Sequence, residues 1–215
     1  MNMSKKNLYV IGARGFGREC IGYFRLWDGF LDRYNIVGFL DDKQDALDGY
    51  EGYPPIVNSV ENFMPKEDDV FLCALGVVKW REVYSSILLN RGAKFDTFIS
   101  PKATVHRSAS IGNGCLILDN TLISSDSKLG DFALCHVGVS IGHDVKLGND
   151  VVCEAQSFCG GFVKVGNRVT LHTRATVLPH KKIGDDAVVG AGSVVISNVR
   201  SGKTVFGVPA LPIDV

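Results

Sequence analysis

Several features that mark other classes of protein are missing from this sequence. Its 215 residues carry 23 basic and 23 acidic side chains, so no net charge attracts nucleic acid or an anionic membrane surface. No apolar run is long enough to cross a bilayer, and the opening MNMSKKNLYVIG lacks the apolar core of a secretion signal. We therefore predict a cytoplasmic protein that binds neither nucleic acid nor membrane.

The six cysteines lack any CxxC pairing. In a chain without a secretion signal, cysteines are expected to be reduced, so the sequence predicts neither disulfides nor a zinc knuckle.

Aromatic residues are scarce in the second half of the chain. All six tyrosines and both tryptophans precede residue 85, whereas residues 101–215 contain only four aromatic side chains, all phenylalanine. This shift predicts two domains, 1–98 and 99–215.

The first half alternates between apolar runs typical of strands and helical stretches. NLYVIG, IVGFLDD and DVFLCALG are the expected strands, with a glycine turn and a helix to about Leu31 after the first and a helix over 77–90 after the third. Such alternation predicts a small parallel sheet with helical crossovers, a Rossmann-like α/β domain.

A glycine loop follows the first strand. Gly12, Gly15 and Gly17 have the spacing GxxGxG, which differs from the dinucleotide fingerprint GxGxxG. With Arg14 beside it, the start of the next helix is a candidate phosphate-binding site, although a glycine turn can also be only a tight connection.

Two adjacent carboxylates close the second strand. Asp41 and Asp42 are candidate ligands for a ribose or a base at the carboxyl edge of the sheet, and their alternative is a pair of solvated turn residues.

The second half repeats every six residues. Seventeen positions from Ile99 to Val195, taken in steps of six, are all apolar. A period of six is the signature of a β-helix whose walls each use one hexad, so residues eighteen apart are neighbours in successive coils. Cys135, Cys153 and Cys159 fall on inward positions and are predicted to be core residues.

The eighteen-residue columns surround His143 with small neighbours. Ser125 lies one coil before it and Gly161 one coil after it, so a ligand can approach the main chain beside the imidazole, and the Gly161 N–H can donate to a developing negative charge. Histidine also has a suitable ordinary pKa for a general base near neutral pH. Asp144 is the expected partner of the ring, with Asp126 as a competitor.

A second column contains His136, Glu154 and His172. Imidazole and carboxylate are metal ligands, but a solvated or substrate-lining column is the preferred interpretation, and we expect no metal.

These motifs together resemble a known family. IGHDVKLG, CGGFVKVG, IGDDAVVGAGSVV and VFGVPA resemble the left-handed β-helix acetyltransferases. VIGARGFGRE, GFLDD and ALG in the first half narrow the resemblance to the bacterial sialic-acid O-acetyltransferases and nucleotide-aminosugar N-acetyltransferases.

The resemblance implies the function and further site residues. His143 would be the general base with Asp144 as its acidic neighbour, acetyl-CoA would be the co-substrate, and the working form would be a homotrimer with coenzyme A between two β-helices. His136 matches a polar residue that contacts substrate in the family. The motifs also assign coenzyme A contacts, namely Gly160, Gly161, Ala191, Gly207 and Pro209.

We therefore expect an N-acetyltransferase acting on a nucleotide-linked amino sugar, with a UDP-sugar preferred, in surface-glycan biosynthesis. Two alternatives stay open: O-acetylation of a sugar such as sialic acid, and a non-catalytic trimeric binding scaffold. Phe16, Val77 and Leu211 depart from the family pattern, and the first two leave the identity of the sugar or nucleotide open.

Overall fold

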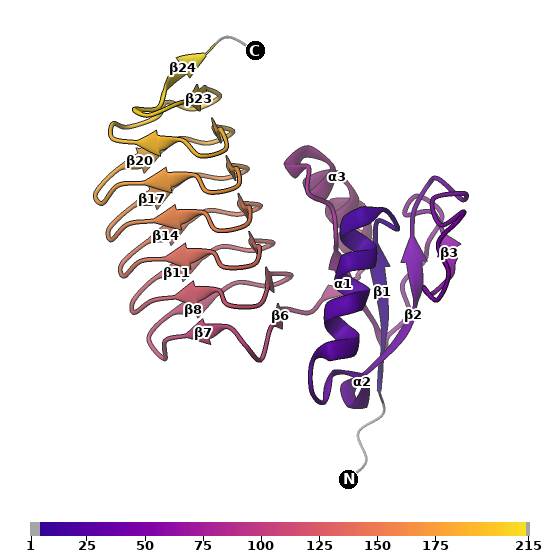
Figure 1. The fold of residues 1–215 in the computed structure, drawn as a ribbon. Helices are drawn as coiled ribbons and strands as arrows, with labels where there is room; N and C mark the ends of the chain where they lie inside the picture. The colour runs from indigo at the N-terminus through magenta and orange to yellow at the C-terminus, as the bar shows by residue number, and fades with distance from the viewer. Residues whose placement is uncertain (1–4, 214–215) are drawn as a thin grey trace. The chain divides into compact units, whose positions relative to one another are not determined.

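The computed structural model describes residues 5–213, which divide between Asp96 and Thr97 into two compact units. We call residues 5–96 the N-terminal unit and residues 97–213 the β-helix unit (Figure 1). No helix within the described residues is long and apolar enough to cross a membrane.

The N-terminal unit is built on a parallel five-stranded sheet in the order β3-β2-β1-β4-β5. From β1 the chain adds β2 and β3 on one side of the sheet, and then β4 and β5 on the other side. Right-handed crossovers in opposite directions place helices on opposite faces of a sheet. The elements are β1 (Lys6–Ile11), α1 (Gly15–Leu26), α2 (Phe30–Arg33), β2 (Tyr34–Leu40), β3 (Ile56–Asn58), β4 (Asp69–Cys73), α3 (Val78–Leu89) and β5 (Lys94–Phe95).

The predicted helices and strands are present, with local differences. The first helix ends at Leu26, and not near Leu31, because Gly29 adopts a left-handed conformation with φ of 69° before the short α2. Strands β3 and β5 were not predicted, since three and two residues are too short to show an alternating pattern.

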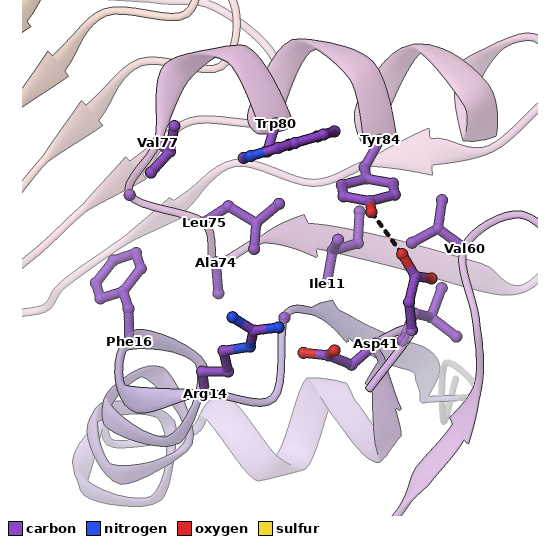
Figure 2. Close-up of a pocket in the computed structure, with 14 residues that line it drawn as sticks. Ile11, Arg14, Phe16, Asp41, Val60, Ala74, Leu75, Val77, Trp80 and Tyr84 are labelled. Carbon is purple, nitrogen blue, oxygen red and sulfur yellow. Dashed lines mark hydrogen bonds between the residues drawn. The ribbon is translucent and has the colours of Figure 1, made fainter. Parts of the chain in front are cut away.

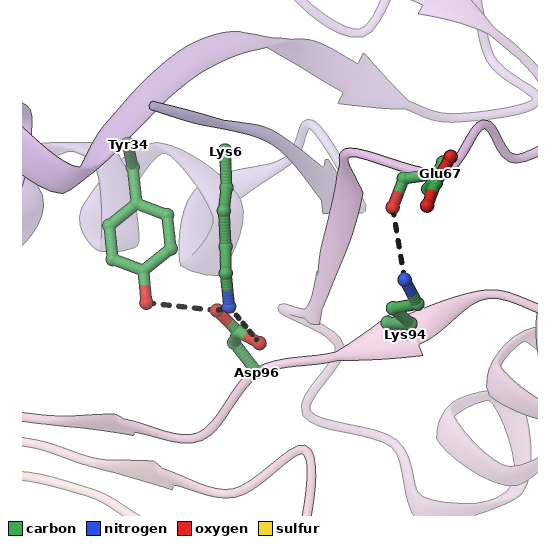
Figure 3. A network of polar contacts seen from close by, with 5 residues as sticks. All are labelled: Lys6, Tyr34, Glu67, Lys94 and Asp96. Carbon is green, nitrogen blue, oxygen red and sulfur yellow. Dashed lines mark hydrogen bonds and ion pairs between the residues drawn. The ribbon is translucent and has the colours of Figure 1, made fainter. Parts of the chain in front are cut away.

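A polar network fastens the end of the N-terminal unit to its sheet (Figure 3). Asp96 accepts hydrogen bonds from Lys6 of β1 at 2.7 Å and from the Tyr34 hydroxyl of β2 at 2.9 Å. Burial and the hydrogen bond to Asp96 raise the pKa of Tyr34 to about 12. Lys94 donates nearby to the carbonyl of Glu67 at 3.2 Å.

The β-helix unit stacks short strands into three walls, as the hexad period predicts (Figure 1). Wall 1 contains β6 (Phe98–Ile99), β9 (Leu116–Ile117), β12 (Leu134–Cys135), β15 (Val152–Cys153), β18 (Thr170–Leu171), β21 (Val188–Val189), β23 (Thr204–Phe206) and β24 (Leu211–Ile213). Wall 2 contains β7 (Thr104–Val105), β10 (Leu122–Ile123), β13 (Ser140–Ile141), β16 (Phe158–Cys159), β19 (Thr176–Val177) and β22 (Val194–Val195). Wall 3 contains β8 (Ser110–Ile111), β11 (Lys128–Leu129), β14 (Lys146–Leu147), β17 (Lys164–Val165) and β20 (Lys182–Ile183).

From β6 to β22 each strand pairs in parallel with the strand eighteen residues away, whereas β23 pairs in parallel with β21 at an offset of sixteen residues and β24 runs antiparallel to β23. The aliphatic hexad residues form one continuous core, and only the first coils leave theirs accessible, with Ile99 41% exposed. Removing such side chains from water is the main force that holds the coils together.

A residue in the left-handed conformation turns the chain after nearly every strand, a feature that was not predicted from the sequence. These residues recur every six positions and are often aspartate, asparagine or glycine, which tolerate positive φ. We call the turn from wall 1 to wall 2 the first corner and the turn from wall 2 to wall 3 the second corner.

Candidate active site

A pocket of about 440 Å³ opens at the carboxyl ends of the strands in the N-terminal unit. The sheet order reverses between β1 and β4, which is where ligands bind in open parallel sheets. Figure 2 shows Trp80 and Tyr84 of α3 on one side of the pocket and Arg14 and Phe16 on the other.

The glycine loop is shaped by close packing. A Cβ on Gly12, whose φ is 95°, would lie 2.6 Å from Leu75, and one on Gly17 would overlap the Gly12 carbonyl oxygen. Gly15 opens α1 and has free space around its Cα, and no acidic residue occupies the first turn of that helix. The predicted anion site is therefore accessible at Gly15 beside Arg14.

The two candidate carboxylates have different roles. Asp41 accepts hydrogen bonds from the amides of Ala13 at 2.8 Å and Lys43 at 2.9 Å, so it holds the glycine loop in shape. Asp42 accepts a hydrogen bond of 2.5 Å from the Tyr84 hydroxyl, and this bond, with partial burial, raises the pKa of Tyr84 to about 12. Both carboxylates line the pocket, but Asp42 is exposed whereas Asp41 is half-buried, so Asp42 is more accessible to a ligand.

A buried guanidinium supports the pocket floor. Arg81 has no exposed surface, and its Nη1 donates to the carbonyls of Cys73 at 2.9 Å and Leu75 at 2.8 Å. These carbonyls belong to the end of β4 and to the loop that lines the pocket. Arg81 thus fixes that loop, a role that sequence reasoning missed.

The β-helix unit places His143 and Asp144 at the second corner, two and three residues after the end of β13. The His143 Nδ1 lies 2.9 Å from an Asp144 carboxylate oxygen, and the two side chains are 57% and 42% exposed. Asp144 and Asp126 were the two candidates for the acidic partner of His143. Asp144 is the one that contacts the ring.

Gly161 lies against the imidazole, one coil after it. A Cβ at this position would come 2.6 Å from His143 Nε2, so only glycine leaves room for the ring. The neighbouring amides of Gly160 and Phe162 donate to backbone carbonyls, whereas within residues 5–213 the Gly161 N–H donates no hydrogen bond. A donor without a partner therefore adjoins the imidazole.

The second histidine column lies at the first corner, at the other end of wall 2. His136 Nδ1 accepts a hydrogen bond from the Val137 amide at 2.9 Å, and His172 Nδ1 lies 3.1 Å from Glu154. Glu154 also accepts from the Thr173 amide at 3.1 Å. Within the described chain, no cluster of three or more histidine, cysteine, aspartate or glutamate side chains can hold a metal ion.

The predicted coenzyme A residues fall into two groups. Gly160 and Gly161 adjoin His143 at the second corner, whereas Ala191 lies at the first corner in a later coil. Gly207, with φ of 101°, donates its amide to Ser193 Oγ at 3.0 Å beside the same corner and precedes the cis peptide of Pro209.

Comparisons with protein families find a match in each of the two units. Residues 7–88 match the family model of the PglD N-terminal domain, and residues 83–194, just over half of the chain, match that of the GMPPB C-terminal domain. The chain belongs to the PglD-type β-helix sugar acetyltransferases.

Solved structures similar to this PglD-type chain cover nearly all of it. PerB from Caulobacter crescentus, in complex with CoA and GDP-perosamine, is 26% identical with a TM-score of 0.86, and 97% of each chain is covered. The acetyltransferase domain of PglB from Neisseria gonorrhoeae, in complex with acetyl coenzyme A, is 26% identical over 98% of this chain and 100% of that one, with a TM-score of 0.86. WeeI from Acinetobacter baumannii is 27% identical over 96% and 99%, with a TM-score of 0.83. A search of curated protein sequences finds no match.

The three cysteines predicted to be core residues, Cys135, Cys153 and Cys159, are buried, and so are the other three cysteines of this PglD-type chain. All six are free thiols. A hydrogen bond with Cys153 and burial raise the pKa of the Cys135 thiol, and burial raises that of Cys159. Buried protonated thiols are poor nucleophiles.

Sequence reasoning missed three aromatic residues near His143. His106 Nδ1 lies 2.8 Å from the hydroxyl of Ser125, which therefore has a partner other than His143. Phe162 and His180 follow Asp144 in the same column, at intervals of eighteen residues, and the eighteen-residue repeat could have revealed both.

Proposed function

We propose that this acetyl-CoA-dependent sugar acetyltransferase transfers the acetyl group to the amino group of a nucleotide-linked amino sugar, with His143 as the general base. The observation that carries the proposal is the His143–Asp144 pair beside the Gly161 N–H, which has no hydrogen-bond partner within the described residues. PerB, 26% identical to this chain, binds CoA and GDP-perosamine, which favours an amino group over a hydroxyl as the acceptor.

Asp144 determines which nitrogen of His143 acts. Because Nδ1 faces the carboxylate at 2.9 Å, it carries the proton, and Nε2 keeps its lone pair for the substrate. The neutral sugar amine attacks the thioester carbonyl, and Nε2 takes a proton from the amine nitrogen as the C–N bond forms. The C–S bond then breaks, and the imidazolium returns the proton to the sulfur of coenzyme A, which leaves as a thiol.

Gly161 has an electrostatic role in this reaction. Negative charge develops on the thioester oxygen during attack, and a backbone N–H held beside it stabilises that charge without reorganisation. The unpartnered amide next to His143 is a suitable donor.

The N-terminal pocket is the proposed site for the nucleotide. Its glycine loop at Gly15 with Arg14 would bind the diphosphate, and Asp42 would accept hydrogen bonds from the ribose or base. A UDP-sugar is the first choice, and GDP- and TDP-sugars are the alternatives.

We also propose a homotrimer with shared active sites. The predicted coenzyme A residues occupy two different corners of one chain, so one groove can contain both groups when the first corner of one copy faces the second corner of another. His136 would then line the groove from the neighbouring copy.

Two experiments test this function. Thiol release from acetyl-CoA, measured with UDP-, TDP- and GDP-linked amino sugars and with free sialic acid, should show turnover with an amino sugar, with mass spectrometry placing the acetyl group on nitrogen. Turnover with sialic acid alone, or with none of these acceptors, would refute the proposed acceptor.

Mixing two inactive variants tests the shared site. His143→Ala alters the second corner, and Ala191→Arg alters the first corner. In a head-to-tail trimer each site needs an intact second corner from one copy and an intact first corner from its neighbour. Random mixing of the two variants should therefore restore about a quarter of the wild-type activity. Sedimentation should report three chains. An active monomer would contradict the shared site.

A further inference from the structure

Three rings lie in contact at the second corner. The imidazole of His143 packs against the Phe162 ring at 5.1 Å between centroids and at 89°, and Phe162 stacks on His180 at 4.9 Å and 7°. The Phe162 amide also donates to the His143 carbonyl at 3.1 Å. The backbone and side chain of Phe162 therefore both contact His143.

Phe162 occupies a left-handed turn position, as Phe132 does in an earlier coil, but Phe132 is buried and Phe162 is not. The φ of Phe162 is 61°, a left-handed conformation that bulky side chains rarely adopt, and its side chain is 44% exposed. Asp126 and Asp144 fill the same corner position in the two preceding coils, as the turn favours. Neither turn formation nor core burial accounts for a phenyl ring here.

The contacts of the His143 imidazole explain why a phenyl ring lies at this corner. His143 is more than half exposed, so the helix core does not fix its ring. Gly161 limits the ring on one side, Asp144 binds Nδ1, and Phe162 packs against it edge to face. With these three contacts the ring has one orientation, and Nε2 is available for the substrate.

We propose that Phe162 is a positioning residue that holds the His143 imidazole in its reactive orientation, and that His180 supports the Phe162 ring by stacking. The inference rests on the proposed role of His143 as the base. A small misplacement of a reacting group can lower the rate strongly, so the contact affects the chemical step more than substrate affinity.

Substituting Phe162 tests the inference. Phe162→Asn keeps a residue that tolerates positive φ but removes the ring, and kcat should fall about tenfold while KM for both substrates stays within about twofold. Phe162→Tyr restores a ring and should recover at least about half of the wild-type kcat. Wild-type kcat in Phe162→Asn, or failure of Phe162→Tyr to recover activity, would overturn the proposal.

Two further variants test whether the loss of kcat is specific to Phe162 and whether His180 contributes to it. Arg168→Asn removes a large side chain from another left-handed corner position, where φ is 54°, and kcat should not change. His180→Asn leaves Phe162 in place without its stacking partner and should lower kcat by about two- to threefold. A tenfold loss in Arg168→Asn would show that any large left-handed residue matters and would overturn the specific role.

A double variant separates this inference from the proposed function. Because Phe162 acts through His143, His143→Ala with Phe162→Asn should be no slower than His143→Ala alone. A further tenfold loss in the double variant would mean that Phe162 acts on substrate itself, against the inference. Normal activity in His143→Ala would instead refute the proposed base.

Discussion

The N-terminal pocket and the second corner use glycine in the same way but differ in how their polar groups are satisfied. In both, a Cβ would come within 2.6 Å of a neighbouring side chain, Leu75 at Gly12 and His143 at Gly161. In the pocket, Asp41 and Asp42 already accept hydrogen bonds from the protein. At the second corner, the Gly161 amide has no partner within the described residues.

In the proposed function, this difference corresponds to the division between substrate binding in the N-terminal pocket and chemistry at the second corner. A carboxylate that is already oriented by the protein can bind a ligand without reorganisation, remote from the reacting atoms. A half-exposed imidazole beside an N–H that lacks a partner among residues 5–213 suits proton transfer and charge stabilisation. Variants of the N-terminal pocket should therefore change the KM of the sugar nucleotide, and variants of the second corner should change kcat.

Apart from His143 itself, the largest effect is expected at Gly161. In Gly161→Ala the new Cβ would lie 2.6 Å from Nε2, so the imidazole must move, and kcat should fall about 10²-fold with bound acetyl-CoA still detectable. Gly22→Ala in α1 is the matched control, because its Cβ would meet no atom within 4 Å. Steady-state kinetics and calorimetry check both, and an active Gly161→Ala would show that the close approach has no role.

A smaller effect is expected at Asp42. Asp42→Ala removes a charged acceptor, so KM for the sugar nucleotide should rise about tenfold while KM for acetyl-CoA stays unchanged. Asp45→Ala, which removes an exposed carboxylate paired with Lys43 at 3.6 Å, should leave both unchanged. An equal rise in the KM values for the sugar nucleotide and for acetyl-CoA would contradict the proposal that the N-terminal pocket binds only the sugar nucleotide.

The smallest effect is expected at the core thiols. Cys159→Ala should keep kcat within about twofold, because the thiol is buried and its raised pKa keeps it protonated. Iodoacetamide near neutral pH should leave the thiols of the folded enzyme unmodified and alkylate them in urea. An acetylated cysteine trapped during turnover would contradict direct transfer.

The sequence predicts the β-helix more fully than the site. The hexad period specifies the strands and the neighbours of His143, because an eighteen-residue coil makes Gly161 adjacent from spacing alone. The different roles of Asp41 and Asp42 depend on where adjacent side chains point, which composition does not reveal. Arg81 was beyond sequence reasoning, since a charged helix residue is ordinarily exposed and its carbonyl partners lie in a loop.

The central claim is that His143 performs the chemistry without binding the substrates. Single-turnover acetyl transfer in His143→Ala, with both substrates saturating and their Kd values measured by calorimetry on the same protein, tests it most directly. The rate should fall by about 10²–10⁴ while both Kd values stay within about twofold of wild type. Transfer within about threefold of the wild-type rate would contradict the account.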